Sequence, residues 1–211
     1  PVISSAASDV YKRQTLDDGR EAPRVLIASR ELALAALRSI AEHVDTCAQA
    51  GGFAGACPAE RNAATTMSVD IEFDPVDPRR RCDLVQIAIG PHIFVFDTYA
   101  YSDVLDHTTI DSVPTLRHWF ASDRVIKVVQ ACGADVTVLR RHGVYLRCCF
   151  DTAIADGLAR EKSGLDSRSL PDLFEAWTGG QPLVHKHELD ATQGVFRQRP
   201  LPDTLLSLIH I

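Results

Sequence analysis

The sequence of 211 residues has no apolar run close to the roughly 20 residues that a membrane-spanning helix needs. It contains no glycine-rich phosphate loop, no Rossmann fingerprint and no Ser-His-Asp signature. Positive charge is not in excess, because 22 Lys and Arg face 28 Asp and Glu for a net charge of −6. This balance argues against nucleic-acid binding by bulk charge alone. With 45% hydrophobic residues, the chain is long and apolar enough for one globular domain.

The six cysteines form no Cys-x-x-Cys pair, which argues against a structural zinc site of that spacing. A zinc site from Cys47, Cys57, His185 and His187 has suitable residue types, but the spacing supports it poorly. We therefore predict free, mostly buried thiols in a reducing compartment. This corresponds to an intracellular protein of the cytoplasm, the nucleus or an organelle.

Both ends of the chain look foreign to the rest. The strings DVYKRQ at residues 9–14 and LSLIHI at residues 206–211 can be encoded by reverse-complementary stretches that resemble a transposon end used in sequencing libraries. We expect residues 1–14 and 206–211 to be non-native, adapter-derived tails around a domain at residues 15–205 that is incomplete at its C-terminus. The natural protein would then continue past Leu205.

Hydrophobic periodicity predicts an α/β fold. A helix is expected at residues 29–43 from its apolar spacing, and residues 45–66 read as a Gly- and Ala-rich loop. Strands at 67–73, 84–89 and 92–96, separated by short turns, predict a three-strand antiparallel meander. Parallel strands are expected at 125–129 and 145–150, with helices at 113–120, 134–142, 151–158 and 169–177. The whole predicts a mixed five-stranded sheet with helices on both faces.

The candidate site begins with two carboxylates on the predicted strand at 67–73. Asp70 and Glu72 are two residues apart, so the strand period places both on one face, opposite an apolar face. Adjacent carboxylates repel each other unless a cation lies between them. Hard divalent ions such as Mg²⁺ or Mn²⁺ favour such oxygen ligands. By itself, Asp-x-Glu is also compatible with an ordinary exposed edge strand.

In its context this stretch resembles the 3′–5′ exonuclease domain of the ribonuclease D type, in the DEDD exonuclease superfamily. The resemblance covers about residues 25–205. The first family motif is seen as SVDIEF at 68–73, followed by LVQIAI at 84–89 and FVFD at 94–97. The second motif is seen as KVVQACGADV at 127–136, where Asp135 matches a metal-binding Asp.

Three further positions complete the resemblance. Relatives often carry His where this chain has Gln130, which implies a change in substrate positioning but not in metal ligands. The string CCFDT at 148–152 resembles the family's Phe-Asp-Thr, and we interpret Asp151 as a helix cap. FRQRPL at 196–201 resembles the family's Trp-x-x-Arg-Pro-Leu, with Phe196 in place of Trp.

The resemblance implies a ribonuclease H-like fold and phosphodiester hydrolysis with two divalent cations, Mg²⁺ or Mn²⁺. Asp70 would ligate both ions, Glu72 the ion that activates the attacking water, and Asp135 the ion at the leaving 3′ oxygen. The third family motif, Tyr or His followed by a fourth Asp, would begin near Leu206. The chain as given is therefore expected to hold three of four acidic ligands, bind metal weakly and be nearly inactive.

The implied partner is the 3′ end of a nucleic acid, RNA in preference to DNA, and no membrane. The alternative is a non-catalytic RNA-binding or adaptor module on the same fold. A third reading is another nuclease or transferase on a ribonuclease H-like fold. The three acidic residues favour the enzyme, because an adaptor has no need of them. Tyr or His followed by Asp beyond Leu205 would support the enzyme over the adaptor.

The sequence gives weaker evidence for a functional role of several other residues. The run of Arg79, Arg80 and Arg81 follows the Asp-x-Glu strand and is equally compatible with phosphate contacts and with a solvated loop. Arg140 and Arg141 are expected to be surface charges. A polar loop explains residues 185–187 (HKH) as well as a substrate contact does. We expect Trp119 and Trp177 to pack in the core.

Overall fold

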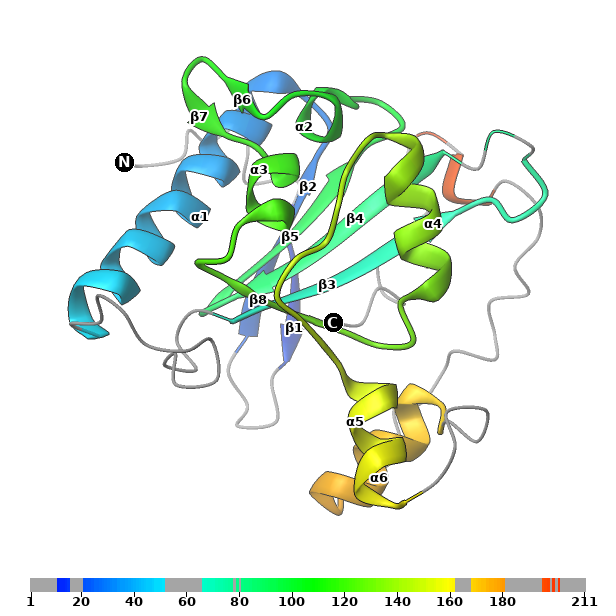
Figure 1. Ribbon diagram of the computed structural model, residues 1–211. Helices are drawn as coiled ribbons and strands as arrows, with labels where there is room; N and C mark the ends of the chain where they lie inside the picture. Colours follow the sequence, from blue (N-terminus) through cyan, green and yellow to red (C-terminus); the bar gives the residue numbers. More distant parts are fainter. Residues whose placement is uncertain are drawn as a thin grey trace.

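A mixed β-sheet forms the centre of the structure (Figure 1). The structure is a computed structural model, which describes residues 11–15, 21–51, 66–77, 79, 81–161, 168–180, 195–197, 199 and 201. Within these ranges the sheet has seven strands in the order β1-β2-β5-β4-β3-β8-β9. The strands are β1 (Tyr11–Thr15), β2 (Glu21–Ile27), β3 (Thr66–Phe73), β4 (Cys82–Ile89), β5 (His92–Asp97), β8 (Ile126–Val129) and β9 (Cys149–Asp151).

The strand pairing confirms the predicted α/β class and the meander. β3, β4 and β5 pair antiparallel in chain order, and β8 and β9 extend the sheet in parallel beyond β3. Two strands more than the predicted five are present. β2 adds in parallel beside β5, and β1, which includes part of the segment that we set aside as foreign, pairs antiparallel with β2. β9 is shorter than predicted, and Tyr145 is exposed in the loop before it.

The helices mostly follow the predicted ranges. α1 continues past residue 43 because Val44 extends its buried stripe. No helix in the described ranges is long and apolar enough to cross a membrane. The helix expected at residues 113–120 begins later than predicted, at Leu116, because its first residues belong to a short hairpin. That hairpin consists of β6 (Thr109–Ile110) and β7 (Val113–Pro114). The helices are α1 (Arg30–Gly51), α2 (Asp103–Asp106), α3 (Leu116–Ala121), α4 (Gly133–Arg141), α5 (Thr152–Ala159), α6 (Leu170–Thr178) and the 3₁₀ turn η4 (Val195–Arg197).

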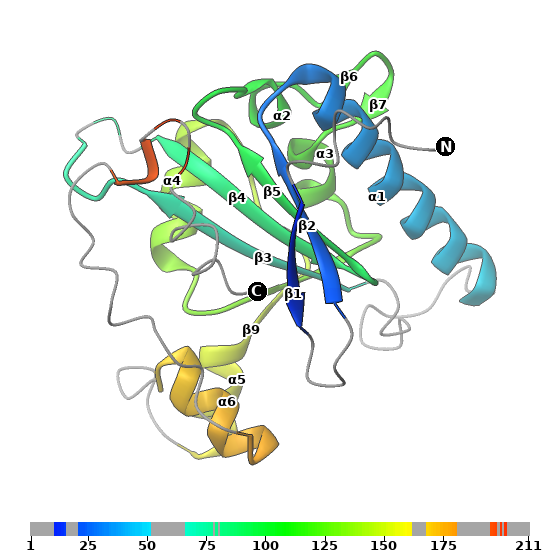
Figure 2. The ribbon, with the colours of Figure 1, turned by 180° about the vertical axis from the view of Figure 1, so that it is seen from behind.

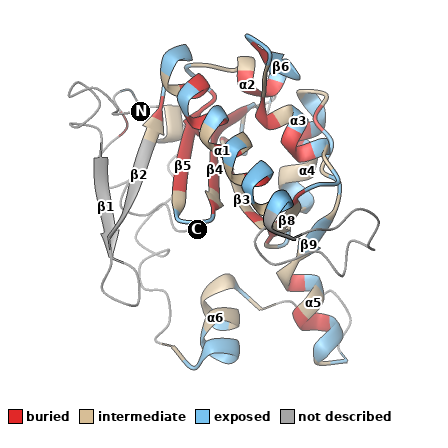
Figure 3. Cartoon of the chain, turned by 90° about the vertical axis from the view of Figure 1, so that its left-hand side faces the viewer, coloured by how far each residue is buried: buried red, intermediate tan, exposed pale blue. Residues whose placement is uncertain are grey.

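The main core lies on one face of the sheet. Alternate residues of β3, namely Met67, Val69 and Ile71, are buried there against side chains of α1, α2, α3 and α4. Figure 3 shows buried residues along β4 and β5, while the outer side of α1 is exposed. Trp119 is 1% exposed in this core, as predicted. Trp177 is 59% exposed, so the core prediction for that residue is wrong.

The opposite face of the sheet is covered differently. Its apolar cluster comprises Leu84 and Val95, with Leu201 and Phe196 from the C-terminal region packed against them. Seen from this side, η4 lies at one end of the sheet, and α2, α3 and α4 lie behind the strands (Figure 2). Helices were predicted on both faces. In the part of the chain that the structure describes, α1 to α4 all contribute to the first core, and a 3₁₀ turn packs on the second face.

Candidate functional site

Asp70 and Glu72 lie on the second face of β3, as their spacing predicts. Their neighbours Val69 and Ile71 are buried in the helix-covered core, whereas both carboxylates are half-buried on the other side. Successive same-face positions of a strand are about 7 Å apart. Antiparallel pairing places Asp70 opposite Gln86 of β4 and Glu72 opposite Leu84. The two acids are therefore held side by side by the central part of the sheet.

Gln86 connects β4 to this pair of acids. Its Nε2 donates a hydrogen bond of 3.2 Å to Oε1 of Glu72, and the residue is 0% exposed. Its own Oε1 is buried and has no hydrogen-bond partner among the described residues. The sequence indicated only that this Gln belongs to the LVQIAI strand, and its contact with Glu72 emerges from the register.

Asp135 comes from another element, the first turn of α4. It is half-buried, and a carboxylate in the first turn interacts favourably with the helix dipole. Burial, followed by the charges of Asp83, Asp135 and Glu72, raises the pKa of the Cys82 thiol. Glu72 precedes Phe73, which pairs with Cys82 at the start of β4, and α4 follows the end of β8, which runs parallel to β3. Glu72 and Asp135 therefore lie toward the same end of the sheet.

Asp151 fixes the loop that leads to Asp135. As predicted, it caps α5, accepting hydrogen bonds from the backbone N–H of Ala153 at 2.9 Å and of Ile154. It also accepts from Ala131 N at 3.0 Å and Cys132 N at 3.1 Å, just before α4. Burial alone would raise the pKa of Asp151, but these backbone N–H groups outweigh it and lower the pKa. This second function was not visible in the sequence.

The three acidic residues fit a hard divalent cation in the chemistry of their donors, since each offers only oxygen. Asp70 and Glu72 share one face, which is the arrangement that two ligands of one ion need. Within the described residues, however, no group of three or more His, Cys, Asp or Glu side chains is close enough to hold an ion. The structure therefore brings together the pair on β3 and leaves Asp135 short of a closed three-way cluster.

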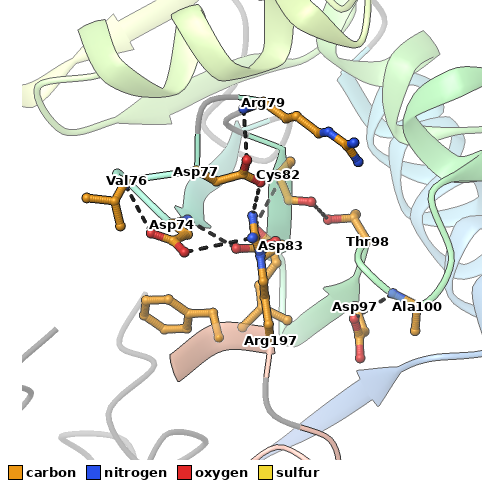
Figure 4. A network of polar contacts seen from close by, with 12 residues as sticks. Asp74, Val76, Asp77, Arg79, Cys82, Asp83, Asp97, Thr98, Ala100 and Arg197 are labelled. Carbon is orange, nitrogen blue, oxygen red and sulfur yellow. Dashed lines mark hydrogen bonds and ion pairs between the residues drawn. The ribbon is translucent and has the colours of Figure 1, made fainter. Parts of the chain in front are cut away.

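Arg197 of η4 anchors the C-terminal region on the sheet (Figure 4). Its Nε donates to Asp83 Oδ1 at 3.1 Å, its Nη2 contacts Asp77, and its Nη1 lies 3.8 Å from Asp74 Oδ2. Burial raises the pKa of Asp83, although Arg197 beside it favours the charged form. The backbone N–H of Arg79 and then the Arg197 guanidinium lower the pKa of Asp77.

Arg199 makes a second anchor beside the first. It bonds to the carboxylate of Asp97, which is 1% exposed. Both guanidinium groups also lie over the Tyr99 ring, Arg197 at 5.8 Å and Arg199 at 5.3 Å from its centre. We call the contacts of Arg197 and Arg199 with these acids the arginine clamp. The FRQRPL string pointed to the segment, but its acidic partners, about a hundred residues away, were not predicted.

The remaining candidates have structural contacts of their own. The Gln130 amide accepts from Thr152 Oγ1 and donates to the Arg168 carbonyl at 3.2 Å, so it joins β8 to the segment before α6. Arg141 donates to the Arg79 carbonyl at 2.9 Å, and Arg140 is exposed. Arg81 lines a cavity of about 270 Å³. Arg80 and residues 185–187 lie outside the described residues.

The cysteine prediction is confirmed in part. Cys47, Cys82, Cys132, Cys148 and Cys149 are thiols that form no disulfide. Only Cys82 among them is fully buried, so the expectation of mostly buried thiols is wrong for this set. Cys57, and with it most of the weakly supported zinc set, lies outside the described ranges.

A family model described as 3′–5′ exonuclease matches residues 47–207. This match includes Asp70, Glu72 and Asp135 and covers most of the chain. The chain therefore belongs to the 3′–5′ exonuclease family. The curated proteins include no match to the sequence.

Solved structures show the same fold. Ribonuclease D of Trypanosoma brucei in complex with RNA U12 is 17% identical, with a TM-score of 0.65 over 87% of this chain and 56% of that one. Escherichia coli ribonuclease D is 17% identical, with a TM-score of 0.60 over 86% of this chain and 39% of that one. The Aedes aegypti Nibbler EXO domain is 15% identical, with a TM-score of 0.60 over 92% and 83%. The chain thus spans about half the length of the two ribonuclease D structures, and the ribonuclease H-like fold is confirmed.

Proposed function

We propose that this chain is the catalytic domain of a metal-dependent 3′–5′ exonuclease that shortens RNA by hydrolysing phosphodiester bonds. The observation that carries the proposal is the pair of half-buried carboxylates, Asp70 and Glu72, on one face of β3 in a member of this family. Two like charges held side by side on a partly buried face are costly unless a cation compensates them. A metal site is the simplest reason to keep both acids there.

Asp70, Glu72 and Asp135 are the residues that would hold two divalent cations, Mg²⁺ or Mn²⁺. Such cations stabilise charge on phosphoryl oxygens and lower the pKa of bound water. They would also reverse the local sign of this acidic region, so that a phosphate backbone could approach despite the net charge of −6. Around them, Gln86 holds the carboxylate of Glu72, and Asp151 fixes the loop that carries Asp135.

RNA is the proposed substrate class because of what the similar structures contain. One is a ribonuclease D solved with RNA U12, and another is described as an exoribonuclease involved in structured RNA processing. The proposed partner is accordingly the 3′ end of an RNA strand.

A degradation assay under enzyme excess tests the proposal. The chain is incubated with Mn²⁺ and a single-stranded RNA labelled at its 5′ end, beside the same strand in DNA. We expect slow shortening in steps of one nucleotide from the 3′ end, with the label retained on every product. Asp70→Asn and Glu72→Gln should abolish shortening, whereas the matched control Glu42→Gln, at an exposed position of α1, should not. Internal cleavage, or shortening that survives Asp70→Asn, would contradict the proposal.

The second candidate is a non-catalytic RNA-binding module on the same fold. The incomplete three-way acidic cluster is the observation in its favour. This alternative holds if the chain binds RNA equally well with and without Mn²⁺, and if neither Asp70→Asn nor Glu72→Gln changes that binding. Mn²⁺ binding that depends on Asp70 and Glu72 supports the enzyme instead.

A further inference from the structure

Gln86 is the least expected side chain of the sheet interior. It lies in the middle of β4, between Asp70 of β3 on one side and Val95 of β5 on the other. It is 0% exposed, and its same-face neighbours Leu84 and Val95 belong to an apolar cluster. Burying an amide is unfavourable unless both of its ends make hydrogen bonds.

Only one end of this amide is satisfied within the described residues. Because an ionised carboxylate can only accept, the NH₂ group must face Glu72, and the hydrogen bond of 3.2 Å follows. The carbonyl oxygen is then turned away from Glu72 and is buried without a partner among the described residues. Reversing the amide would set two acceptors against each other. The Glu72 contact therefore determines the orientation at the expense of the other end.

Packing alone does not explain such a residue. Met has nearly the same length and would fill the position without burying any polar atom. A half-satisfied buried polar group is less stable than an apolar one of similar shape. Local choices that lower stability in this way are characteristic of functional positions.

We propose that Gln86 is a positioning residue that fixes the carboxylate of Glu72 on the face it shares with Asp70, at a cost in fold stability. The inference rests on the proposed function, because it gives the fixed carboxylate a purpose as a metal ligand. Groups that hydrogen-bond to metal-ligating side chains commonly change metal affinity by about 10–100-fold when they are removed. Gln86 acts through Glu72 and does not itself contact the ion or the substrate.

The proposal predicts opposite effects on metal binding and on stability. In the full chain, without nucleic acid, Mn²⁺ binding is followed by water-proton relaxation, which detects weak sites, and thermal unfolding is measured without metal. Gln86→Met should weaken Mn²⁺ binding about tenfold. The metal-free melting temperature should stay equal or rise, because a partly unsatisfied amide is removed. The matched control is Gln49→Met, at an exposed position of α1, which should change neither quantity.

A double mutant separates positioning from a general effect on the fold. Glu72→Gln alone should weaken Mn²⁺ binding, and adding Gln86→Met should then weaken it no further, because the carboxylate that Gln86 holds is gone. Gln86→Asn is a second test of positioning, because it keeps the amide but is too short to reach Glu72, and it should show the same loss of Mn²⁺ binding.

Three results would overturn the proposal. If Gln86→Met binds Mn²⁺ like the original chain while Glu72→Gln does not, Gln86 has no positioning role and the proposed function stands. If Gln86→Met lowers the metal-free melting temperature, the residue is structural. If the original chain binds no Mn²⁺, or Glu72→Gln binds it unchanged, the proposed ligands are wrong and the role of Gln86 fails with them.

Discussion

The two faces of the sheet are built from the same strands but are covered by different things. On one face the side chains of β3 are Met67, Val69 and Ile71, and helices α1 to α4 enclose them. On the other face the same strand presents Asp70 and Glu72, and η4 with Leu201 packs against a small apolar cluster nearby. The strand period of two thus places the core side chains of β3 on one face and its candidate metal ligands on the other. Substitutions on the two faces should have different consequences.

The largest effect on stability is expected on the helix-covered face. Ile87 of β4 is 0% exposed in the main core. Ile87→Ala should lower the free energy of unfolding by about 2–5 kcal/mol, from lost burial and the cavity left behind. Urea denaturation measures it. The adjacent Gln86→Met, on the other face, provides the comparison, and a similar loss there would erase the difference between the faces.

The arginine clamp should come next, on the second face. Arg197→Met leaves Asp83, which is 0% exposed, without its guanidinium partner. Removing one member of a buried ion pair costs about 3 kcal/mol. The double variant Arg197→Met with Asp83→Asn should recover part of that loss in the same denaturation assay. No recovery would mean that Arg197 acts mainly through Asp74, Asp77 or Tyr99.

The loop before Asp135 should be sensitive to pH through Asp151. The pKa of Asp151 is lowered in the folded chain from its ordinary value of 3.8. A carboxyl with a depressed folded pKa stabilises the fold above its unfolded pKa, and this stability is lost as pH falls through the folded pKa. Asp151→Ala should cost about 1 kcal/mol at pH 7. Denaturation at several pH values should show that difference shrinking below pH 3.8, and a constant difference would contradict the account.

The smallest effects on stability are expected from the candidate metal ligands and from exposed ion pairs. Asp70→Asn and Asp135→Asn should reduce Mn²⁺ binding, measured by water-proton relaxation, with little loss of metal-free stability. The exposed pair of Arg124 with Asp45 provides a control, because breaking it with Arg124→Met should change unfolding by less than about 1 kcal/mol and leave Mn²⁺ binding intact. A large loss of stability in Asp70→Asn would instead assign that acid to the fold.

Much of the fold could be predicted from local pattern. The alternation at residues 66–73 and the turns on either side of β4 define the meander, and Asp151 before α5 is a local cap signal. These features depend on residues close together in the chain, where periodicity and capping chemistry act directly. The ends of α1 and β9 were less predictable, because packing against distant elements decides where they stop.

Long-range polar contacts could not be predicted in the same way. The pairing of Arg197 with Asp83 joins residues more than a hundred positions apart, and nothing local distinguishes that acid from the others. The burial of Lys127 could not be predicted from local pattern either. It lies fully buried among the core residues and donates to the carbonyls of Ser122 and Val125, and its burial lowers the pKa to about 8. Trp177 is largely exposed because its indole N–H reaches Asp156 instead of the core.

The central claim is that Asp70 and Glu72 form the heart of a divalent-cation site in this exonuclease fold. The most direct measurement is an anomalous difference map from crystals of the full chain soaked in Mn²⁺. The account predicts a peak within ligand distance of a carboxylate oxygen of both Asp70 and Glu72, and its loss in Glu72→Gln. A fully occupied Mn²⁺ elsewhere in the molecule, with no density beside β3, would contradict it.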